Sequence, residues 1–563
     1  MGPLRTAGAW VAAAVVLGAC TAPPSRDASE TGAPEAPRAF KRIHAAILSD
    51  PPYIYNALSP ANAAGSDAIE DLVHDGLTVL DNRGERRPRL AEAIPSIENG
   101  LWKVLDDGRM ETTWRIRRDV RWHDGAPLAP EDLAFTAQVL GDREMAVLYA
   151  ATPYSLIEAV EVVDLATVVV RWKRPYIEAD TLFESPLPRH VLVRAYGENK
   201  ATFEQLPYFV DEFVGLGPYR LREWTRGSSV VLAANDHYVL GRPRVDEVVV
   251  KFFLDANTLV ASLLADAVQV TLGRGLSLEQ AITLREQWSA GRVENAPANE
   301  IRVWPQLINP SPSVASSVPF RRAMLHAIDR QQMVDALEAG LSTVAHAWVQ
   351  PSDPEYADLQ RAIVRYEFDP RRAMQLIEGL GYARGTDGLY GDAQGQRLSV
   401  EIRANETNAI LPRAMLSVAD YWQRIGVGVE PVIIPRQQAQ DRRYRATFPA
   451  FELVRGASDL SAFGILHSSQ TRRPDNSYSG SNSPGYMSPE FDALVEQWQT
   501  TIPRRDRLQV IGQMIRRITD EVVVLGLFYD IEPTAIAKPV QGMTARARGG
   551  TTQAWNAHEW DVP

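Results

Sequence analysis

Residues Trp114–Leu128 read WRIRRDVRWHDGAPL and combine a strand signal with a turn signal. Trp114 and Ile116 alternate with arginines, and this period of two places the apolar side chains on one face of a β-strand. The Asp124-Gly125 pair is typical of a tight turn. We interpret His123-Asp124-Gly125 as part of that turn rather than as a catalytic set.

Further strand signals flank this stretch on both sides. Leu398–Ala404 alternates apolar and polar residues and predicts a half-buried strand. Val168–Val170 and Val248–Val250 are continuous apolar runs, which are typical of strands buried on both faces.

Three helices are predicted from apolar stripes and their end signals. One starts with Asp369 as N-cap and Pro370 at the first helical position, and Gly381 closes it. Another starts at Ser488-Pro489, and a third follows Pro319 and ends near Gly340. Helix and strand signals alternate along the chain, which predicts an α/β or α+β protein with several lobes.

Length and composition set further bounds. A chain of 563 residues with 45% hydrophobic residues is long enough for two to four folded domains. Acidic residues outnumber Lys and Arg by 70 to 59, giving a net charge of -11. Because phosphate backbones are bound by clustered cations, this balance argues against a nucleic-acid partner.

The N-terminus has the pattern of an export signal. An apolar run of about ten residues ends in Leu17-Gly18-Ala19-Cys20, which resembles the lipobox of bacterial lipoproteins. We expect residues 1–19 to be a signal peptide and Cys20, the single cysteine, to be lipidated. Residues 20–39 are rich in Pro, Ala and Ser and are expected to be a disordered tether. A plain signal peptide with a coincidental cysteine is the alternative.

Motifs for the common catalytic chemistries are missing from the sequence. It contains no phosphate-binding loop, no G-x-S-x-G nucleophile elbow and no paired-histidine zinc spacing. Seventy carboxylates guarantee chance pairs, so an acid–base dyad is neither excluded nor supported. We therefore expect no enzyme activity, no metal and no cofactor.

Eight stretches, taken in order, resemble the extracellular solute-binding proteins of ABC importers, family 5, whose members bind peptides, dipeptides or nickel. The resemblance covers about residues 43–545. The stretches are DLVHDGL (71–77) with PRLA (88–91), residues 114–128, the helix from Pro130, GLGPYRL (215–221), residues 235–245, FRRA with AIDR (320–330), residues 369–382, and MSPEFDAL (487–494).

The resemblance implies a two-lobed periplasmic-binding-protein-like type II fold of mixed α/β and α+β content, with a hinge and an extra inserted domain. The first lobe is expected to comprise residues 40–65, 206–305 and 528–563. The inserted domain is expected at 66–205 and the second lobe at 306–527.

It also implies a function and its partners. We expect a substrate-binding lipoprotein of an ABC importer that captures a peptide, or a peptide-like solute bearing an amine, between two closing lobes. It would deliver the ligand to ABC permease subunits as a monomer, and a lipid anchor would be its sole link to the membrane. The expected location is the cell envelope: the outer face of the cytoplasmic membrane, the periplasm, or the outer membrane.

In peptide-binding members, an aspartate late in the second lobe pairs with the α-amino group of the peptide. Asp459 is its best counterpart here, and Arg455 is an added cation nearby. The family's tryptophan and Asp-Pro or Glu-Pro pair are not retained around Asp459, which weighs against a standard peptide. A helix N-cap or a surface turn is the alternative role for Asp459.

The remaining ligand-contact candidates are expected near a crossing between the lobes or in the first lobe. For Trp304, the alternative role is packing in the core. The candidates are Trp304, Gln306 and Asn309 near the second crossing, and Tyr53 and Tyr55 in the first lobe.

Three other functions remain open at this point. A sensor of the same fold would present ligand to a membrane receptor without transport. A lipid-anchored hydrolase would need a nucleophile or an acid–base pair in the cleft. Nickel binding occurs within the family, but the nine histidines are scattered.

Overall fold

A computed structural model describes residues 39–59, 63–142, 144–145, 151–406, 409–438, 441–546 and 551–563. The expected signal peptide, Cys20 and residues 20–38 of the expected tether lie outside the described residues. Every helix within these ranges is too short or too polar to cross a bilayer.

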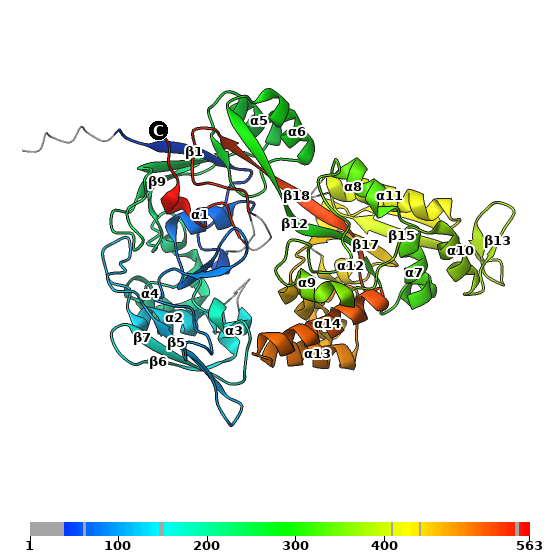
Figure 1. Ribbon diagram of the computed structural model, residues 1–563, viewed down its shortest axis with the longest axis horizontal. Coiled ribbons are helices and arrows are strands. Elements are labelled where there is room, and N and C mark those ends of the chain that lie inside the picture. The colour runs from blue at the N-terminus through cyan, green and yellow to red at the C-terminus, as the bar shows by residue number, and fades with distance from the viewer. Residues whose placement is uncertain are drawn as a thin grey trace, which may run out of the picture. The chain divides into compact units, whose positions relative to one another are not determined.

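One ten-stranded sheet runs through the chain (Figure 1), and its spatial order mixes strands that are distant in sequence. In spatial order it consists of β16 (Gly428–Ile433), β15 (Ser399–Ala404), β17 (Phe451–Gly456), β12 (Gly291–Pro305), β18 (Leu525–Ala537), β11 (Val270–Thr271), β1 (Arg42–Ile47), β10 (Glu247–Phe252), β9 (Ser229–Ala234) and β8 (Tyr219–Thr225).

Strands β12 and β18 connect the two halves of this sheet. They pair antiparallel from Gly291 opposite Ala537 to Val303 opposite Leu525. The register shifts between Pro297 and Asn299 and again after Ile301, so the ladder is irregular near its middle. Such irregularities bend a strand and increase its twist.

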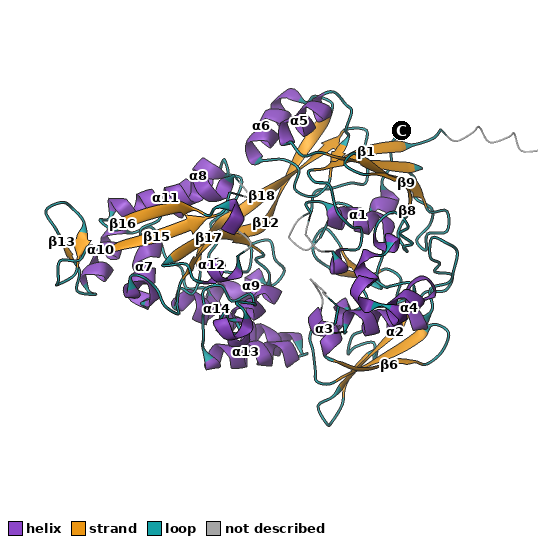
Figure 2. Cartoon of the chain, turned by 180° about the vertical axis from the view of Figure 1, so that it is seen from behind, coloured by secondary structure: helices purple, strands orange, loops and turns teal. Residues whose placement is uncertain are grey.

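The second-lobe part of the sheet is covered by helices on both faces (Figure 2). Each face has its own apolar cluster, while the edge strand β16 keeps exposed residues such as Glu430. One face carries α7 (Val318–His326), α8 (Arg330–Leu337), α10 (Pro370–Glu378) and α11 (Ile410–Arg424), and the other carries α9 (Tyr356–Leu359), α13 (Pro489–Thr500) and α14 (Arg504–Asp520). The short helix α12 (Arg442–Ala446) and the hairpin of β13 (Ala383–Arg384) and β14 (Tyr390–Gly391) complete this part.

The first lobe and the inserted domain share one apolar cluster. The first lobe carries α5 (Ala256–Leu264) and α6 (Leu278–Gln287). The segment expected as the insert comprises α1 (Ser66–Val73), the hairpin β2 (Thr78–Leu80) and β3 (Arg86–Pro88), the sheet β4 (Trp102–Val104), β5 (Met110–Arg115), β7 (Thr167–Trp172) and β6 (Ile157–Val162), and the helices α2 (Pro130–Leu140), α3 (Ala151–Ser155) and α4 (Arg189–Glu198).

The His123-Asp124-Gly125 turn holds the Gly215–Pro218 turn in place. The His123 backbone N–H donates to the Gly215 carbonyl oxygen (3.0 Å), and the His123 ring contacts the Gly215 N–H and the Gly217 carbonyl oxygen. A Cβ on Gly217 would lie 2.3 Å from the His74 backbone nitrogen, so glycine is needed there. Burial lowers the pKa of His123 to about 4, so the ring is neutral at pH 7. The predicted turn role of this set is confirmed.

The strand predictions hold with one difference. Residues 399–404 of the predicted strand form β15, and the two valine runs lie in β7 and β10. However, Val169 and Val249 are only half-buried, so the prediction that both faces are buried was wrong for these strands. Strand β7 pairs antiparallel with β5, and β10 pairs antiparallel with β9. Antiparallel sheets commonly leave one face nearer to solvent.

Two helix starts are confirmed, and one helix is divided. Asp369 accepts from the Arg372 N–H at the start of α10, and Ser488 caps α13. The helix expected from Pro319 to Gly340 is interrupted after α7, because Asp329 caps a new helix, α8. The divisions between the two lobes and the insert stay a prediction.

A buried ion pair in the second lobe generates a stability prediction. Glu452 on β17 accepts hydrogen bonds from Arg403 Nε (3.1 Å) and Nη2 (2.8 Å) of β15, and it also pairs with Arg445. The side chains of Glu452 and Arg403 are each 2% exposed. Glu452→Ala leaves a buried guanidinium without its partner, and should lower the free energy of unfolding by about 3–5 kcal/mol. Urea unfolding followed by circular dichroism measures this loss.

Glu430→Ala on the exposed face of the edge strand β16 is the matched control. It should change the free energy of unfolding by about 0.5 kcal/mol or less. Equal losses for the two variants would contradict a stabilising role of the buried pair.

Candidate functional site

A cavity of about 520 Å³ lies beside the crossing strand β18; we call it the hinge cavity. Its walls come from the first lobe, the second lobe and β18, and they combine apolar side chains with six charged ones. This is the usual composition of a small-molecule site. Its charged lining residues are Arg274, Glu279, Glu338, Arg413, Asp530 and Glu532, and its apolar ones include Leu48, Leu276, Leu278, Leu337, Ile410 and Ile531.

A charged cluster forms the β18 wall of the hinge cavity. Asp530 and Glu532 alternate along β18, and both pair with Arg455 of β17. Glu532 also pairs with Arg546, and Arg274 Nε lies 3.7 Å from a Glu532 carboxylate oxygen. Glu532 is 4% exposed, so one buried carboxylate faces three guanidinium groups.

Glu338, directly after α8, adds a neutral acid to this cavity. Its side chain is 1% exposed, and one carboxyl oxygen accepts weakly from the Ile531 N–H at 3.4 Å. The other oxygen has no hydrogen-bond partner among the described residues. Burial, with a smaller contribution from Asp530, raises the pKa of Glu338 to about 9, so it is protonated at neutral pH.

Arg274 is held by a tightly packed loop between two glycines. Gly273 has φ +61, and a Cβ there would lie 2.6 Å from the Gly65 backbone. The Gly273 N–H also donates to the Gln553 side chain at 3.0 Å. The backbone on the N-terminal side of Arg274 is therefore fixed, although its side chain is 49% exposed.

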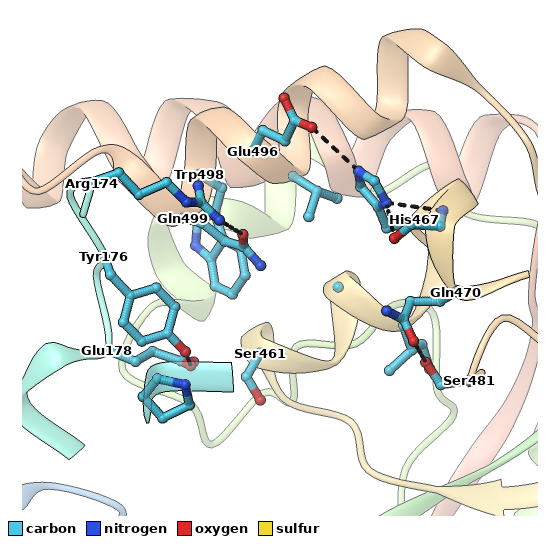
Figure 3. A pocket seen from close by; sticks show the side chains of 15 residues that line it. Arg174, Tyr176, Glu178, Ser461, His467, Gln470, Ser481, Glu496, Trp498 and Gln499 are labelled. Atoms are coloured by element: carbon cyan, nitrogen blue, oxygen red, sulfur yellow. Dashed lines mark hydrogen bonds and ion pairs between the residues drawn. The ribbon is translucent and has the colours of Figure 1, made fainter. Parts of the chain in front are cut away.

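A second cavity, of about 560 Å³, lies between the expected insert and the second lobe; we call it the insert cavity (Figure 3). Tyr176 donates to Glu178 at 2.7 Å on the insert side. Arg174 reaches across to the Gln499 side-chain oxygen of α13 at 3.3 Å. The wall from the second lobe includes Trp498 and Glu496 of the same helix.

Direct contacts join the two sides beside the insert cavity. The Ile177 N–H donates to the Gln499 carbonyl oxygen at 2.9 Å. Ile177 packs against an apolar cluster of the second lobe, and Ile502 packs in return against the cluster of the first lobe and insert. At the hinge cavity, Arg413 of α11 pairs with Glu279 of α6. Direct contacts between the two sides therefore lie beside both the insert cavity and the hinge cavity.

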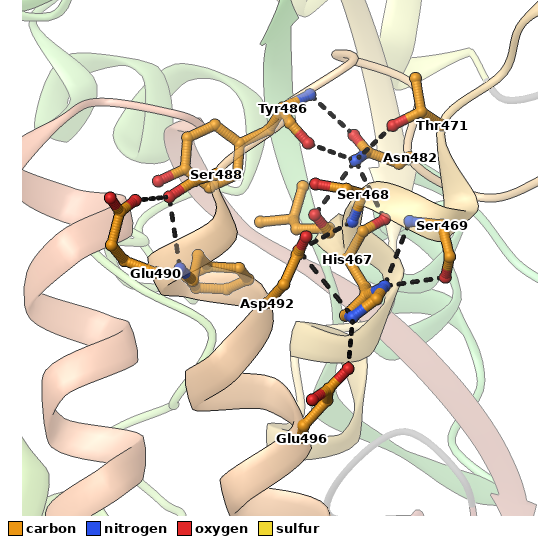
Figure 4. Close-up of polar contacts among 12 residues, drawn as sticks. His467, Ser468, Ser469, Thr471, Asn482, Tyr486, Ser488, Glu490, Asp492 and Glu496 are labelled. Atoms are coloured by element: carbon orange, nitrogen blue, oxygen red, sulfur yellow. Dashed lines mark hydrogen bonds and ion pairs between the residues drawn. The ribbon is translucent and has the colours of Figure 1, made fainter.

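His467 has a structural role at the edge of the insert cavity (Figure 4). Its Nδ1 accepts a hydrogen bond from the Ser469 N–H (3.1 Å) and lies 2.8 Å from the Ser469 hydroxyl oxygen. The His467 ring thereby caps a short 3₁₀ helix at 468–470. Its Nε2 lies 3.7 Å from Glu496 and 4.0 Å from Asp492. These contacts fix the loop, and buried Asn482 fixes it further by donating to the His467 carbonyl oxygen (3.3 Å) and to the Thr471 hydroxyl oxygen (3.2 Å).

The structure places Asp459 at the start of a 3₁₀ helix, 460–466, where its side chain accepts from the Ser461 and Ala462 N–H groups. It is half-buried, and its charge adds to the effect of burial in raising the pKa of Glu178, which lines the insert cavity. Asp459 therefore has the capping role that was its alternative. Arg455 pairs with Asp530 and Glu532 of β18, beside the hinge cavity rather than the insert cavity.

Trp304 and Gln306 serve the interior of the second lobe in this conformation. Trp304 is 4% exposed and packs edge-on against Trp348, with the Arg302 guanidinium 4.8 Å from both ring centroids. Gln306 donates to the Phe448 carbonyl oxygen at 3.1 Å. Asn309 is exposed in the loop that follows. The predicted contacts of these residues with a ligand remain untested.

The two tyrosines of the first lobe differ in burial. Tyr55 is fully buried, donates to the Ser185 carbonyl oxygen at 2.7 Å and packs against His74 and Phe209. Tyr53 is half-buried against the same apolar cluster. Of the seven predicted ligand-contact residues, Arg455 alone pairs directly with charged residues that line the hinge cavity.

Sequence reasoning missed the charged residues of the hinge cavity. Two signals were present. Asp530 and Glu532 interrupt an otherwise apolar run, and Arg274 stands between two glycines. Buried acids within a strand require partners, and a glycine pair marks a close backbone approach.

Two lobes that enclose a cavity beside a shared crossing strand define a two-lobed ligand-binding protein, the type II periplasmic-binding-protein class. The model of the bacterial extracellular solute-binding proteins, family 5, matches residues 86–477. The chain belongs to this family.

Relatives and solved structures agree with this assignment. The oligopeptide-binding protein AppA of Bacillus subtilis is 23% identical over 546 residues, covering 94% of this chain and 93% of that protein. Its structure with a nonapeptide has a TM-score of 0.72 at 21% identity, covering 93% of this chain and 99% of that one. NikZ from Campylobacter jejuni, solved with Ni(L-His), has a TM-score of 0.73 at 20% identity, covering 92% and 99%. The fold class expected from the sequence is confirmed.

The raised pKa of Glu338 predicts a pH-dependent effect of Glu338→Gln. The folded pKa of about 9 exceeds the ordinary 4.5, so folding takes up a proton between these values. The stability contributed by this carboxyl is complete below pH 4.5 and is lost as pH rises toward 9. Glutamine stays neutral, so the variant should match the wild-type melting temperature at pH 5 and exceed it by several degrees at pH 9. Calorimetry at pH 5, 7 and 9 measures the difference.

Glu367→Gln, an exposed carboxyl of the second lobe, is the control and should give the same offset at each pH. A Glu338→Gln offset that does not change with pH would show that Glu338 is ionised in the folded protein.

Proposed function

We propose that the protein is the substrate-binding lipoprotein of an ABC importer. It captures a peptide, or a peptide-like solute bearing an amine, between its lobes and delivers it to membrane permease subunits. The single observation that carries this proposal is the hinge cavity, because its walls come from both lobes and from the crossing strand. A ligand bound there makes contacts that exist only when the lobes are together, and so it favours the closed state.

Two findings support a peptide-like ligand. AppA is named for oligopeptide binding and was solved with a nonapeptide. Asp459 is a half-buried carboxylate whose charge acts on Glu178, so these two acids would attract a cationic α-amino group. Among the described residues, no group of three His, Cys, Asp or Glu side chains could hold a metal ion. We therefore favour a peptide over a bare nickel ion as the ligand.

The proposed location follows from the N-terminus. A lipidated Cys20 would tether the folded body through residues 20–39 to a membrane surface. Two acyl chains give stable anchoring where one chain gives marginal binding. The family's extracellular class agrees with a place outside the cytoplasm.

Peptide binding through Asp459 predicts a defined charge effect. Asp459→Asn keeps a capping side chain for the helix at 460–466 but removes the negative charge. Wild-type protein should bind a pool of tri- to pentapeptides, with a melting temperature raised by a few degrees at 100 times the dissociation constant. The variant should bind the same pool at least tenfold more weakly, because a charge-assisted hydrogen bond is lost. Thermal shift and isothermal calorimetry measure both effects.

Asp506→Asn, an exposed acid at the start of α14, is the matched control and should bind as the wild type does. N-acetylated peptides should bind wild type and Asp459→Asn equally. Peptide binding that is unaffected by Asp459→Asn would leave a peptide-binding protein whose amine anchor lies elsewhere.

Lipidation is tested at Cys20. Cys20→Ser removes the thiol that would carry the diacylglyceryl group, so the protein should incorporate no labelled palmitate and should move from the membrane to the soluble fraction. Metabolic labelling and cell fractionation measure this change. Equal membrane association of the variant and the wild type would contradict the anchor.

A ligand sensor is the second candidate, since a sensor of this fold closes on ligand in the same way. Uptake of a bound peptide by cells that carry the chain and its neighbouring permease separates the two. Uptake that depends on the chain supports import, and binding without uptake supports sensing.

A further inference from the structure

The hinge cavity contains a guanidinium group with little of its hydrogen-bonding capacity used. Arg274 lines the cavity, and Glu532 is the single carboxylate within 4 Å of it among the described residues. That contact is long, at 3.7 Å, and involves Nε. Neither Nη group has a hydrogen-bond partner among the described residues, so both can donate to a ligand in the cavity that Arg274 lines.

Glu532 cannot neutralise Arg274 alone, because it is shared. Arg455 and Arg546 both pair with Glu532, and Arg455 also pairs with Asp530. Three guanidinium groups therefore face two buried carboxylates. Asp67 also attracts Arg274, but it is exposed at the start of α1, where solvent and salt screen its charge.

We propose that the hinge cavity binds a carboxylate group of the ligand, with Arg274 as its bidentate partner. This inference rests on the proposed function and specifies one end of the ligand. A guanidinium presents two parallel N–H donors whose spacing matches a carboxylate, and such charge-assisted pairs are among the stronger hydrogen bonds in proteins. A ligand carboxylate here would balance the third positive charge of the cluster.

Glu338 supports the same chemistry independently. It lines the cavity, is 1% exposed, and has an oxygen without a partner among the described residues. A protonated carboxyl donates a hydrogen bond, and a carboxylate is a strong acceptor. Burial keeps Glu338 in this neutral, donating form at pH 7, because its pKa is raised to about 9.

The positive charge around Arg274 also argues against a cation directly beside it. Burial lowers the pKa of Arg274 and Arg455 lowers it further, while Asp530 and Asp67 act in the opposite direction. Arg413 also lines the cavity, where it pairs with Glu279. An ammonium group placed against Arg274 would be repelled by its guanidinium group, whereas Glu279, Asp530 and Glu532 line other parts of the cavity. The amine end of the ligand would therefore lie away from Arg274.

The test uses the whole mature protein and four pools of pentapeptides. Two pools have Glu as the middle residue and two have Gln. Within each pair, one pool ends in a free C-terminal acid and the other in a C-terminal amide. If the C-terminal carboxylate occupies the hinge cavity, wild type should bind both acid pools at least tenfold more tightly than the amide pools. If a side-chain carboxylate occupies it, the Glu pools should bind at least tenfold more tightly than the Gln pools. Isothermal calorimetry gives the dissociation constants.

Arg274→Gln should abolish whichever preference the wild type has, and Arg274→Lys should retain a reduced preference because it keeps the charge without the fork. Arg285→Gln, an exposed arginine of the nearby helix α6, changes the net charge equally and should keep the wild-type preference. Circular dichroism melts of each variant check that it is folded, and Arg274→Lys preserves the test if Arg274→Gln is not.

The outcomes separate this inference from the proposed function. Tight binding of all four pools with equal affinity would overturn the carboxylate site and leave peptide capture intact. A preference that persists in both Arg274 variants would also overturn it. If wild type binds none of the four pools, then the peptide ligand class and the carboxylate site are both overturned.

Discussion

The antiparallel pairing of β12 with β18 is the constraint on which the rest of the structure depends. These two strands carry the sheet from one lobe to the other, so a relative movement of the lobes must be accommodated within them. The pairing is continuous at both ends but changes register near its middle, where an extra residue weakens the ladder and increases the local twist. A change of register inside a paired ladder bends the strands without separating them, and the proposed closure of the lobes on a ligand would use this bend.

The charged cluster lies beside this irregular segment, and its position explains why so much charge is buried there. Asp530 and Glu532 are adjacent to the bend on β18, whereas Arg455 belongs to the second lobe and Arg274 to the first. Buried carboxylates are costly unless they are paired, so the cluster ties residues of both lobes to the same strand. An anion that enters the hinge cavity changes the charge balance where the two lobes meet. In the proposed mode of binding, a carboxylate there would couple binding to closure through electrostatics as well as through shape.

The sequence predicted the architecture well because its signals are local. Period-two alternation marked β15, and the cap residues Asp369 and Ser488 marked the starts of α10 and α13. The error at Asp329 has a physical reason, since an aspartate within an apolar stripe can either lie on a helix surface or cap a new helix. The site was predicted less well, because it is assembled from residues far apart in the chain. Arg274 and Glu532 are separated by more than 250 residues, and no periodicity reports on such a contact.

The architecture was predicted better than the site because different residues determine the two. The stretches that carry the family resemblance fix the backbone. For example, His123 forms hydrogen bonds with the backbone of the Gly215–Pro218 turn. Arg274, Glu338 and Glu532 lie outside those stretches, on loops and on the crossing strand. Substitutions at such positions can alter the charge and shape of the cavity while the strand pairing and the turns stay as they are. Ligand preference can therefore vary between proteins of this fold while the architecture is kept, and a ligand must be argued from the cavity of each chain.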